Sequence, residues 1–400
     1  MSRHPPPGLS TGVALVAIVL VSVNLRPGAS TVGPVLAEIR SGLGLSGGLA
    51  GLLTGLPGLC FALAGGLAVA FARRVGITVG IALGLVAATV GLLLRPGTGT
   101  PWVFLALSAL ALAGMAVGNV LVPAWIKRHG GGHQVALATV YGTALIVGAT
   151  IGQALTAPLA SSLGSWQRAL GVWGLLVLLA LPLWVGLALR ERRDPGDHLD
   201  SGPAPAGRIA TSPTAVAMTV LFGIQSMHAY VQLGWLPQVY RDAGLSADHA
   251  GALAALLSAT GIIGALAMPT LIVRAPSLLP YVVTFGVLLA GGYGGLALWP
   301  ATVPWLWALM LGVAGFAFPL VIAMLPARTR HPQVTAQLSG FVQPVGYLVA
   351  AAGPVLVGML HEATGGWNAV LVLLALTAVP FTWAGLRASG SVYVDDELRA

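Results

Sequence analysis

The sequence has few charged residues and almost no cysteine. Asp, Glu, Lys and Arg make up 8% of its 400 residues, whereas a soluble domain carries about 25%. So few charges cannot keep the surface of a folded chain of this size in water, and we expect lipid to cover most of it. The single cysteine, Cys60, cannot form an intramolecular disulfide. The sequence also contains no Walker, nucleophile-elbow or metal-binding motif, so we predict no enzyme activity, no cofactor and no metal ion.

Apolar residues fill 56% of the chain and gather in long runs. A helix needs about 20 mostly apolar residues to cross a hydrocarbon core of roughly 30 Å. The runs predict twelve transmembrane helices, at residues 12–36, 47–71, 76–95, 101–126, 134–158, 167–190, 213–237, 248–272, 278–298, 303–325, 334–360 and 367–387. The first run could also be a signal peptide, but the eleven spans that follow favour a retained helix.

Lys and Arg are unevenly distributed between the predicted loops. With the N-terminus in the cytoplasm, fourteen of the 19 lie inside, Arg26 lies within a span, and the outside holds four: Arg40, Arg95, Arg168 and Arg241. Because basic residues favour cytoplasmic loops, we predict a multi-pass inner-membrane protein with both termini in the cytoplasm. The net charge of +8 then reflects topology, and we expect no nucleic-acid partner.

The chain divides near its midpoint. Residues 191–212 are polar and form the one long connection, which predicts an N-terminal six-helix bundle (1–190), a cytoplasmic linker and a C-terminal six-helix bundle (213–400). Leu45-Ser46 recurs as Leu245-Ser246, and two other short matches have offsets of 201 and 199 residues. An even number of helices in each copy makes the copies parallel. The predicted fold class is therefore an all-α membrane protein with the major facilitator fold, whose substrate site lies near the midplane.

All eleven acidic residues lie away from the middle of the predicted spans, but one basic residue does not. Arg26 lies about 14 residues into the first span, between Asn24 and Pro27. An unpaired guanidinium at that depth is costly. It could bond main-chain carbonyls or extend out of the hydrocarbon; we favour a place in a water-filled cavity, where it attracts an anionic or dipolar solute. Pro27 can kink the helix there.

His228 is the one histidine well inside a predicted span. Because imidazole changes charge near neutral pH, His228 could bind substrate or carry a coupled proton; a neutral histidine bonded within the bundle is the alternative. Gln225, His228 and Gln232 are spaced to share one helical face. Other candidates, for which a bond between helices is an equally good explanation, are Asn119, Tyr141, Gln343 and Tyr347.

Several stretches resemble the cyanate/nitroimidazole transporter family of the major facilitator superfamily. They are Asn24-Leu25-Arg26-Pro27 and residues 50–64, 118–123, 225–226, 235–237 and 338–347. The resemblance covers nearly the whole chain and implies a secondary transporter of small polar solutes, with cyanate as the best-known candidate. The superfamily's loop motif after the second helix is degenerate here, at 66–76, because it lacks its Asp.

We therefore predict a monomeric secondary transporter that moves a small polar or anionic solute across the bilayer by alternating access. Arg26 would supply positive charge, Asn24 and Asn119 orienting hydrogen bonds, and His228 with Gln225 the opposing wall, while Tyr141, Gln343 and Tyr347 complete the site. Two alternatives stay open. One is efflux of a neutral or weakly charged drug, and a more remote one is a membrane receptor that does not translocate.

Overall fold

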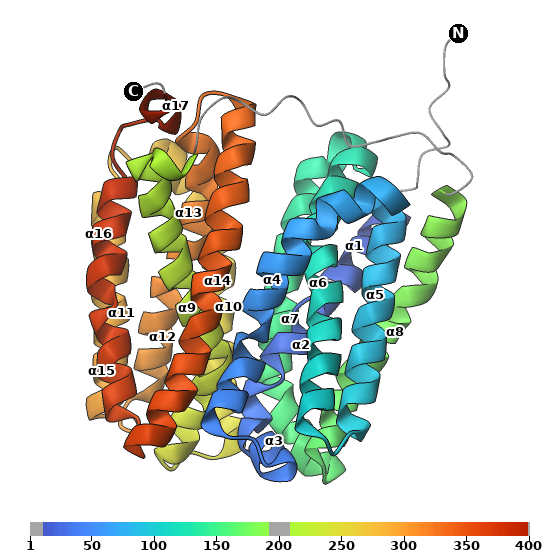
Figure 1. The fold of residues 1–400 in the computed structure, drawn as a ribbon, viewed down its shortest axis with the longest axis vertical. Coiled ribbons are helices and arrows are strands. Elements are labelled where there is room, and N and C mark those ends of the chain that lie inside the picture. Colours follow the sequence, from blue (N-terminus) through green and yellow to red (C-terminus); the bar gives the residue numbers. More distant parts are fainter. Residues whose placement is uncertain (1–10, 192–208, 399–400) are drawn as a thin grey trace.

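The computed structural model describes residues 11–191 and 209–398, and this part of the chain is helical (Figure 1). The N-terminal half comprises α1 (Thr11–Asn24), α2 (Pro27–Ser30), η1 (Gly33–Val35), α3 (Leu36–Leu43), α4 (Gly47–Val75), α5 (Ile77–Leu94), η2 (Arg95–Gly97), α6 (Pro101–His129), η3 (Gly131–His133), α7 (Gln134–Leu163) and α8 (Trp166–Glu191). The C-terminal half comprises η4 (Ile209–Thr211), α9 (Pro213–Asp242), α10 (Ala247–Arg274), α11 (Leu279–Leu298), α12 (Pro304–Ala314), α13 (Ala317–Ala327), α14 (Pro332–Thr364), α15 (Asn368–Leu376), α16 (Ala378–Ala388) and α17 (Val394–Glu397).

Twelve segments of the described residues are long and apolar enough to cross a membrane, which confirms the predicted spans and the helical fold class. Large apolar side chains point outward along them: Leu179 is 67% exposed and Val273 is 83% exposed. Such a surface suits lipid and would be costly in water. Most of the predicted linker, residues 192–208, lies outside the described residues, so the three domain boundaries stay predictions.

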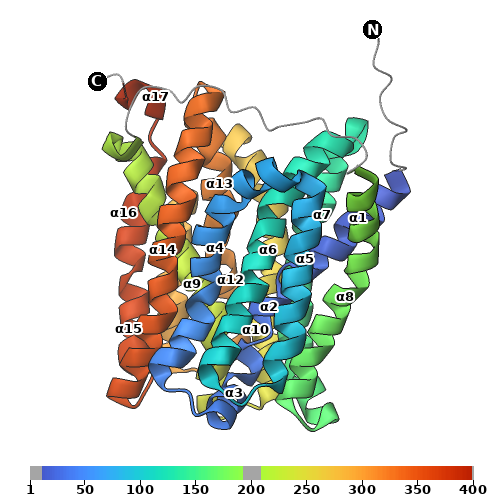
Figure 2. The ribbon, with the colours of Figure 1, turned by 45° about the vertical axis from the view of Figure 1, so that its right-hand side comes forward.

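The two halves approach each other at one end and diverge at the other (Figures 1 and 2). We call these the α3 end and the α17 end. Near the α3 end, α4 packs backbone to backbone on α14: a Cβ at Gly51 would lie 2.4 Å from the Pro354 carbonyl oxygen, and one at Gly55 would lie 2.6 Å from that of Ala351. Gly66 lies further along the same face of α4, and a Cβ there would meet nothing within 4 Å. The backbones of the two helices are therefore in close contact in the part nearer the α3 end and separate toward the α17 end.

The first span is broken where the sequence predicted one helix. α1 ends at Asn24, and the short helix α2 begins at Pro27. Proline has no N–H to continue the helical ladder. The chain restarts instead with bonds from the Ala29 and Ser30 amides to the Arg26 carbonyl oxygen, at 3.0 and 3.1 Å. Arg26 thus occupies the break itself, as the N-cap residue of α2.

Candidate substrate site

Arg26 lies between the two halves and has no polar partner in the described part of the chain. Its guanidinium carbon is 5.6 Å from the centroid of the Phe61 ring on α4. Its charge also acts on the hydroxyl groups of Tyr141 on α7, Tyr230 on α9 and Tyr347 on α14. Among the described residues, none forms a hydrogen bond or ion pair with the half-buried guanidinium. The guanidinium therefore neither bonds main-chain oxygens of the described residues nor extends outward into lipid, which were the two alternatives left open by the sequence.

Aromatic rings from both halves form a wall beside Arg26. The Tyr347 ring is 5.6 Å from Phe61, 5.0 Å from Phe222 and 6.3 Å from Tyr230, centroid to centroid. Phe61 belongs to the N-terminal half, and the other three belong to the C-terminal half. We call Arg26, Phe61, Tyr141, Tyr230 and Tyr347 the Arg26 cluster. Sequence reasoning missed Phe61, Phe222 and Tyr230 because an aromatic residue in an apolar span usually serves packing.

Two amide side chains next to the cluster have hydrogen-bonding capacity to spare. The Tyr141 hydroxyl donates to the Asn119 carbonyl oxygen and to its Oδ1, both at 3.0 Å. The Asn119 Nδ2 group donates to no described residue. Gln343 lies one turn before Tyr347 on α14, is half-buried, and its amide bonds to no residue in the described part of the chain. Each half thus contributes one amide with unused hydrogen-bonding capacity.

Asn24 lies near Arg26 in sequence but is bonded elsewhere. Its side chain is 5% exposed, and Nδ2 donates to the Leu20 carbonyl oxygen at 2.8 Å and to that of Leu176, on α8, at 3.3 Å. These bonds hold α1 on α8 within the N-terminal half. The geometry favours this structural role over the predicted one of orienting substrate.

His228 is fully buried inside the C-terminal half, and both of its ring nitrogens have partners. Nε2 lies 2.8 Å from the Thr377 Oγ1, whose own hydrogen goes to the Leu374 carbonyl oxygen. Nδ1 lies 3.0 Å from the Tyr293 hydroxyl oxygen, which also accepts from Gln232. The Thr377 oxygen is therefore placed to accept from Nε2–H, and the Tyr293 hydroxyl is placed to donate to Nδ1. This pattern describes a neutral imidazole.

The polar face of α9 exists as predicted but points away from Arg26. His228 lies roughly 200° around the helix from Ser226, and Ser226 shares its face with Phe222 and Tyr230 of the aromatic wall. Gln225 is 3% exposed, and its Oε1 accepts no hydrogen bond from the described residues. His228 thus turns toward Tyr293 of α11 and Thr377 instead of the Arg26 cluster, because helical spacing predicts which residues share a face but not where it points. Gln225 lies between the two faces, about 60° from both His228 and Phe222, and its predicted role at the site stays a prediction.

Arg95 is one of the four basic residues predicted to lie on the outside, and its side chain is 0% exposed. Nη1 donates to the Gly28 carbonyl oxygen at 3.2 Å and to the Ser108 hydroxyl at 3.5 Å, and the guanidinium lies over the Phe104 ring. The sequence did not reveal this burial, because an arginine at the end of an apolar run fits a loop and a buried turn equally well.

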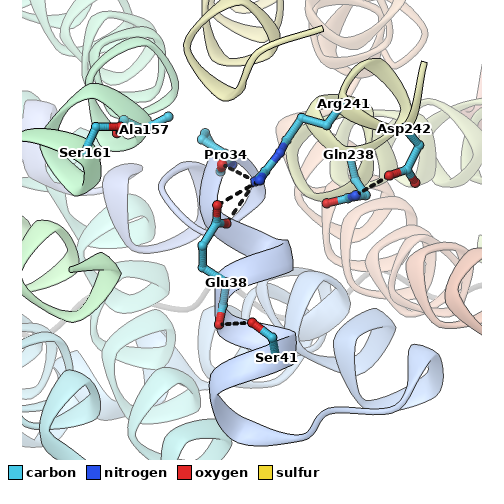
Figure 3. A network of polar contacts seen from close by, with 8 residues as sticks. All are labelled: Pro34, Glu38, Ser41, Ala157, Ser161, Gln238, Arg241 and Asp242. Atoms are coloured by element: carbon cyan, nitrogen blue, oxygen red, sulfur yellow. Dashed lines mark hydrogen bonds and ion pairs between the residues drawn. The ribbon is translucent and has the colours of Figure 1, made fainter. Parts of the chain in front are cut away.

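Charged side chains at the α3 end join the halves. Arg241 at the end of α9 pairs with both carboxylate oxygens of Glu38 on α3, at 2.8 and 2.9 Å, and donates to the Pro34 carbonyl oxygen at 3.4 Å (Figure 3). Glu362 of α14 accepts the N–H of Gly47, the first residue of α4, at 2.8 Å. Sequence reasoning treated Glu38, Arg241 and Glu362 as loop charges and missed that they meet across the halves.

The fold defines a class: polytopic membrane carriers built of two helical halves. The chain matches the family model described as Major Facilitator Superfamily over residues 18–354, and it belongs to that superfamily. It is a membrane transporter of small solutes.

Two relatives confirm the resemblance seen in the sequence. The chain is 32% identical over 378 residues to the 2-nitroimidazole transporter of Escherichia coli, covering 94% of this chain and 95% of that one. It is 30% identical over 359 residues to the cyanate transport protein CynX of the same organism, covering 88% and 91%. Among solved structures, the E. coli xylose transporter XylE has a TM-score of 0.75 at 13% identity, covering 96% of this chain and 98% of that one, which supports the fold.

Proposed function

We propose that this chain is a secondary active transporter that carries a small anionic or strongly dipolar solute by alternating access, with Arg26 as its principal binding group. The observation that carries the proposal is the half-buried, unpaired guanidinium in the break of the first span, between the two halves. A cation kept at this depth without a carboxylate partner is costly unless a ligand or water compensates it. Asn119 and Gln343 add hydrogen bonds from the two sides.

The halves support the alternating-access part of the proposal. Contacts of Glu38 with Arg241 and of Glu362 with Gly47 join them at the α3 end, while α4 and α14 diverge toward the α17 end. With the topology predicted from the basic residues, the α17 end faces the cytoplasm. The described conformation then opens inward, and transport requires the α3-end contacts to break. His228 is not carried forward as a proton carrier, because both of its nitrogens are bonded in this conformation.

Proteoliposomes loaded with unlabelled solute and given labelled cyanate test the charge role by counterflow. Arg26→Ala should reduce uptake at least tenfold, since it removes a charge-assisted contact of about 1.5–3 kcal/mol. Arg26→Lys should retain part of it. Arg168→Gln is the matched control, because Arg168 is exposed and donates only to a main-chain oxygen. Uptake by Arg26→Ala at the wild-type rate would disprove the charge role.

A second candidate function, export of a flat and weakly charged compound, is favoured by the aromatic wall of Phe61, Phe222, Tyr230 and Tyr347. Aromatic rings can stack on such a solute. Labelled 2-nitroimidazole in the same vesicles separates the two functions. Transport of 2-nitroimidazole that is insensitive to Arg26→Ala but lost in Tyr347→Ala, with no cyanate counterflow, would favour this second function.

A further inference from the structure

Arg95 is a second buried arginine in the N-terminal half, outside the Arg26 cluster. It occupies the turn η2, after α5, and reaches two other elements: Gly28 of α2 and Ser108 of α6. Its Nε and Nη2 atoms are buried and donate to no described residue. No carboxylate of the described chain forms an ion pair with it. Charge balance therefore does not explain why an arginine stands here.

The bond to Gly28 has a clear structural consequence. α2 has only four residues, so its carbonyl oxygens cannot all be satisfied within the helix. The Pro27 and Ala29 oxygens accept from the Thr31 and Val32 amides, whereas the Gly28 oxygen accepts no backbone hydrogen bond within the described chain. Arg95 supplies the donor that this buried oxygen needs.

Gly28 is held from a second side as well. A Cβ at this position would lie 2.6 Å from the sulfur of Met115 on α6, so α2 lies directly on α6. The Arg95 bond and the Met115 contact thus fix α2 two residues beyond Arg26. Since Arg26 is the N-cap residue of α2, a shift or rotation of α2 changes where its guanidinium lies.

We propose that Arg95 is a positioning residue: by holding the Gly28 carbonyl oxygen it fixes α2 and thereby places Arg26 between the halves. The proposal rests on the proposed role of Arg26 in binding solute. It assigns no contact between Arg95 and the solute. Lysine at position 95 could still donate to the Gly28 oxygen, whereas glutamine is too short to reach it from the same backbone position.

A labelling experiment tests the geometry without any transported solute. In a Cys60→Ala background, Arg26→Cys gives a single thiol, whose rate of reaction with the anionic reagent sulfonatoethyl methanethiosulfonate reports the surroundings of position 26. Adding Arg95→Gln should change that rate at least about fivefold, whereas Arg95→Lys and the control Arg168→Gln should leave it within about twofold. An unchanged rate in the Arg95→Gln protein would overturn the proposal.

Cyanate counterflow with Arg26 intact supplies the functional readout. Arg95→Gln should raise KM about tenfold with a smaller change in kcat, and Arg95→Lys should restore KM. If labelling changes while cyanate is not transported by wild type, the positioning role stands and the proposed function fails. If labelling does not change, the positioning role fails whatever cyanate does.

A second variant keeps the test valid if Arg95→Gln does not fold. Gly28→Ala places a methyl group against the Met115 sulfur and displaces α2 by an independent route. It should change the labelling rate at position 26 in the same assay, and Met115→Ala should reverse the change by making room. Wild-type labelling in folded Gly28→Ala protein would contradict the claim that α2 sets the position of Arg26.

Discussion

The ion pair of Glu38 and Arg241 gives a quantitative test of closure at the α3 end. Two contacts of 2.8 and 2.9 Å join the side chains, which are 37% and 22% exposed. An exposed pair contributes about 0.2–1 kcal/mol, and a hydrogen bond to a charged group contributes about 1.5–3 kcal/mol. For this half-buried, two-point pair we expect about 1–2 kcal/mol. Glu38→Gln should therefore shift the equilibrium from closed to open at the α3 end about 5- to 30-fold.

Distance measurement across the α3 end detects this shift. Ser41 of α3 and Asp248 of α10 are exposed and belong to different halves. With Cys60→Ala, Ser41→Cys and Asp248→Cys, nitroxide labels report the separation of the halves by double electron–electron resonance. Glu38→Gln should add or enlarge a long-distance population, because the carboxylate charge that pairs with Arg241 is gone.

The double variant Glu38→Gln with Arg241→Gln supplies the control. Each single variant leaves one charge without its partner, whereas the double variant leaves none, so its shift should be smaller than the sum of the two single shifts. Identical distance distributions in wild type and Glu38→Gln would refute the reasoning. Strict additivity of the two single variants would show that the pair contributes nothing to closure.

The α4 glycines, His228 and the C-terminal segment give three further predictions. In the same resonance assay Gly51→Val should open the α3 end, because its Cβ would overlap the Pro354 oxygen, whereas Gly66→Val should leave the distances unchanged. If both variants gave the same distances, close packing of α4 on α14 near the α3 end would not be what holds the halves together there. Uptake by His228→Gln should keep the wild-type pH dependence. If the pH dependence disappeared in this variant, His228 would be shown to carry a proton. Burial raises the pKa of the Glu397 carboxyl, but bonds from Ser212 and Thr214 and the charge of Arg387 outweigh it and lower the pKa below the usual value. The stability from Glu397 is thus present above about pH 4.5 and lost as pH falls through the lowered value, so Glu397→Gln should flatten the acid side of a Tm–pH curve, and an unchanged curve would count against this role.

The sequence predicted the spans well because the bilayer imposes a single strong requirement, about 20 apolar residues for each crossing. Arg26 could be singled out for the same reason, since a charge inside such a run is costly. Which other residues lie near Arg26 depends on how each helix is rotated about its own axis. Gln225 and His228 were placed on one helical face from their spacing, but whether that face meets Arg26 or α11 is set by packing between helices. Phe61 has no polar group, and the hydroxyl of Tyr230 does not distinguish it from an aromatic residue that serves packing.

The break in the first span shows why separate charges could not be connected from the sequence. Arg26 and Glu38 are twelve residues apart on one stretch of α2, η1 and α3. Arg95 holds that stretch at Gly28, and Arg241 holds it at Pro34 and Glu38. Between them Gly33 packs directly on α9, where a Cβ would lie 2.1 Å from the Leu233 carbonyl oxygen. We therefore expect a movement of α9 that breaks the Glu38 pair to displace the segment that begins at Arg26 as well. On the proposed function, opening of the α3 end and the position of the proposed binding group would then be coupled through this one segment.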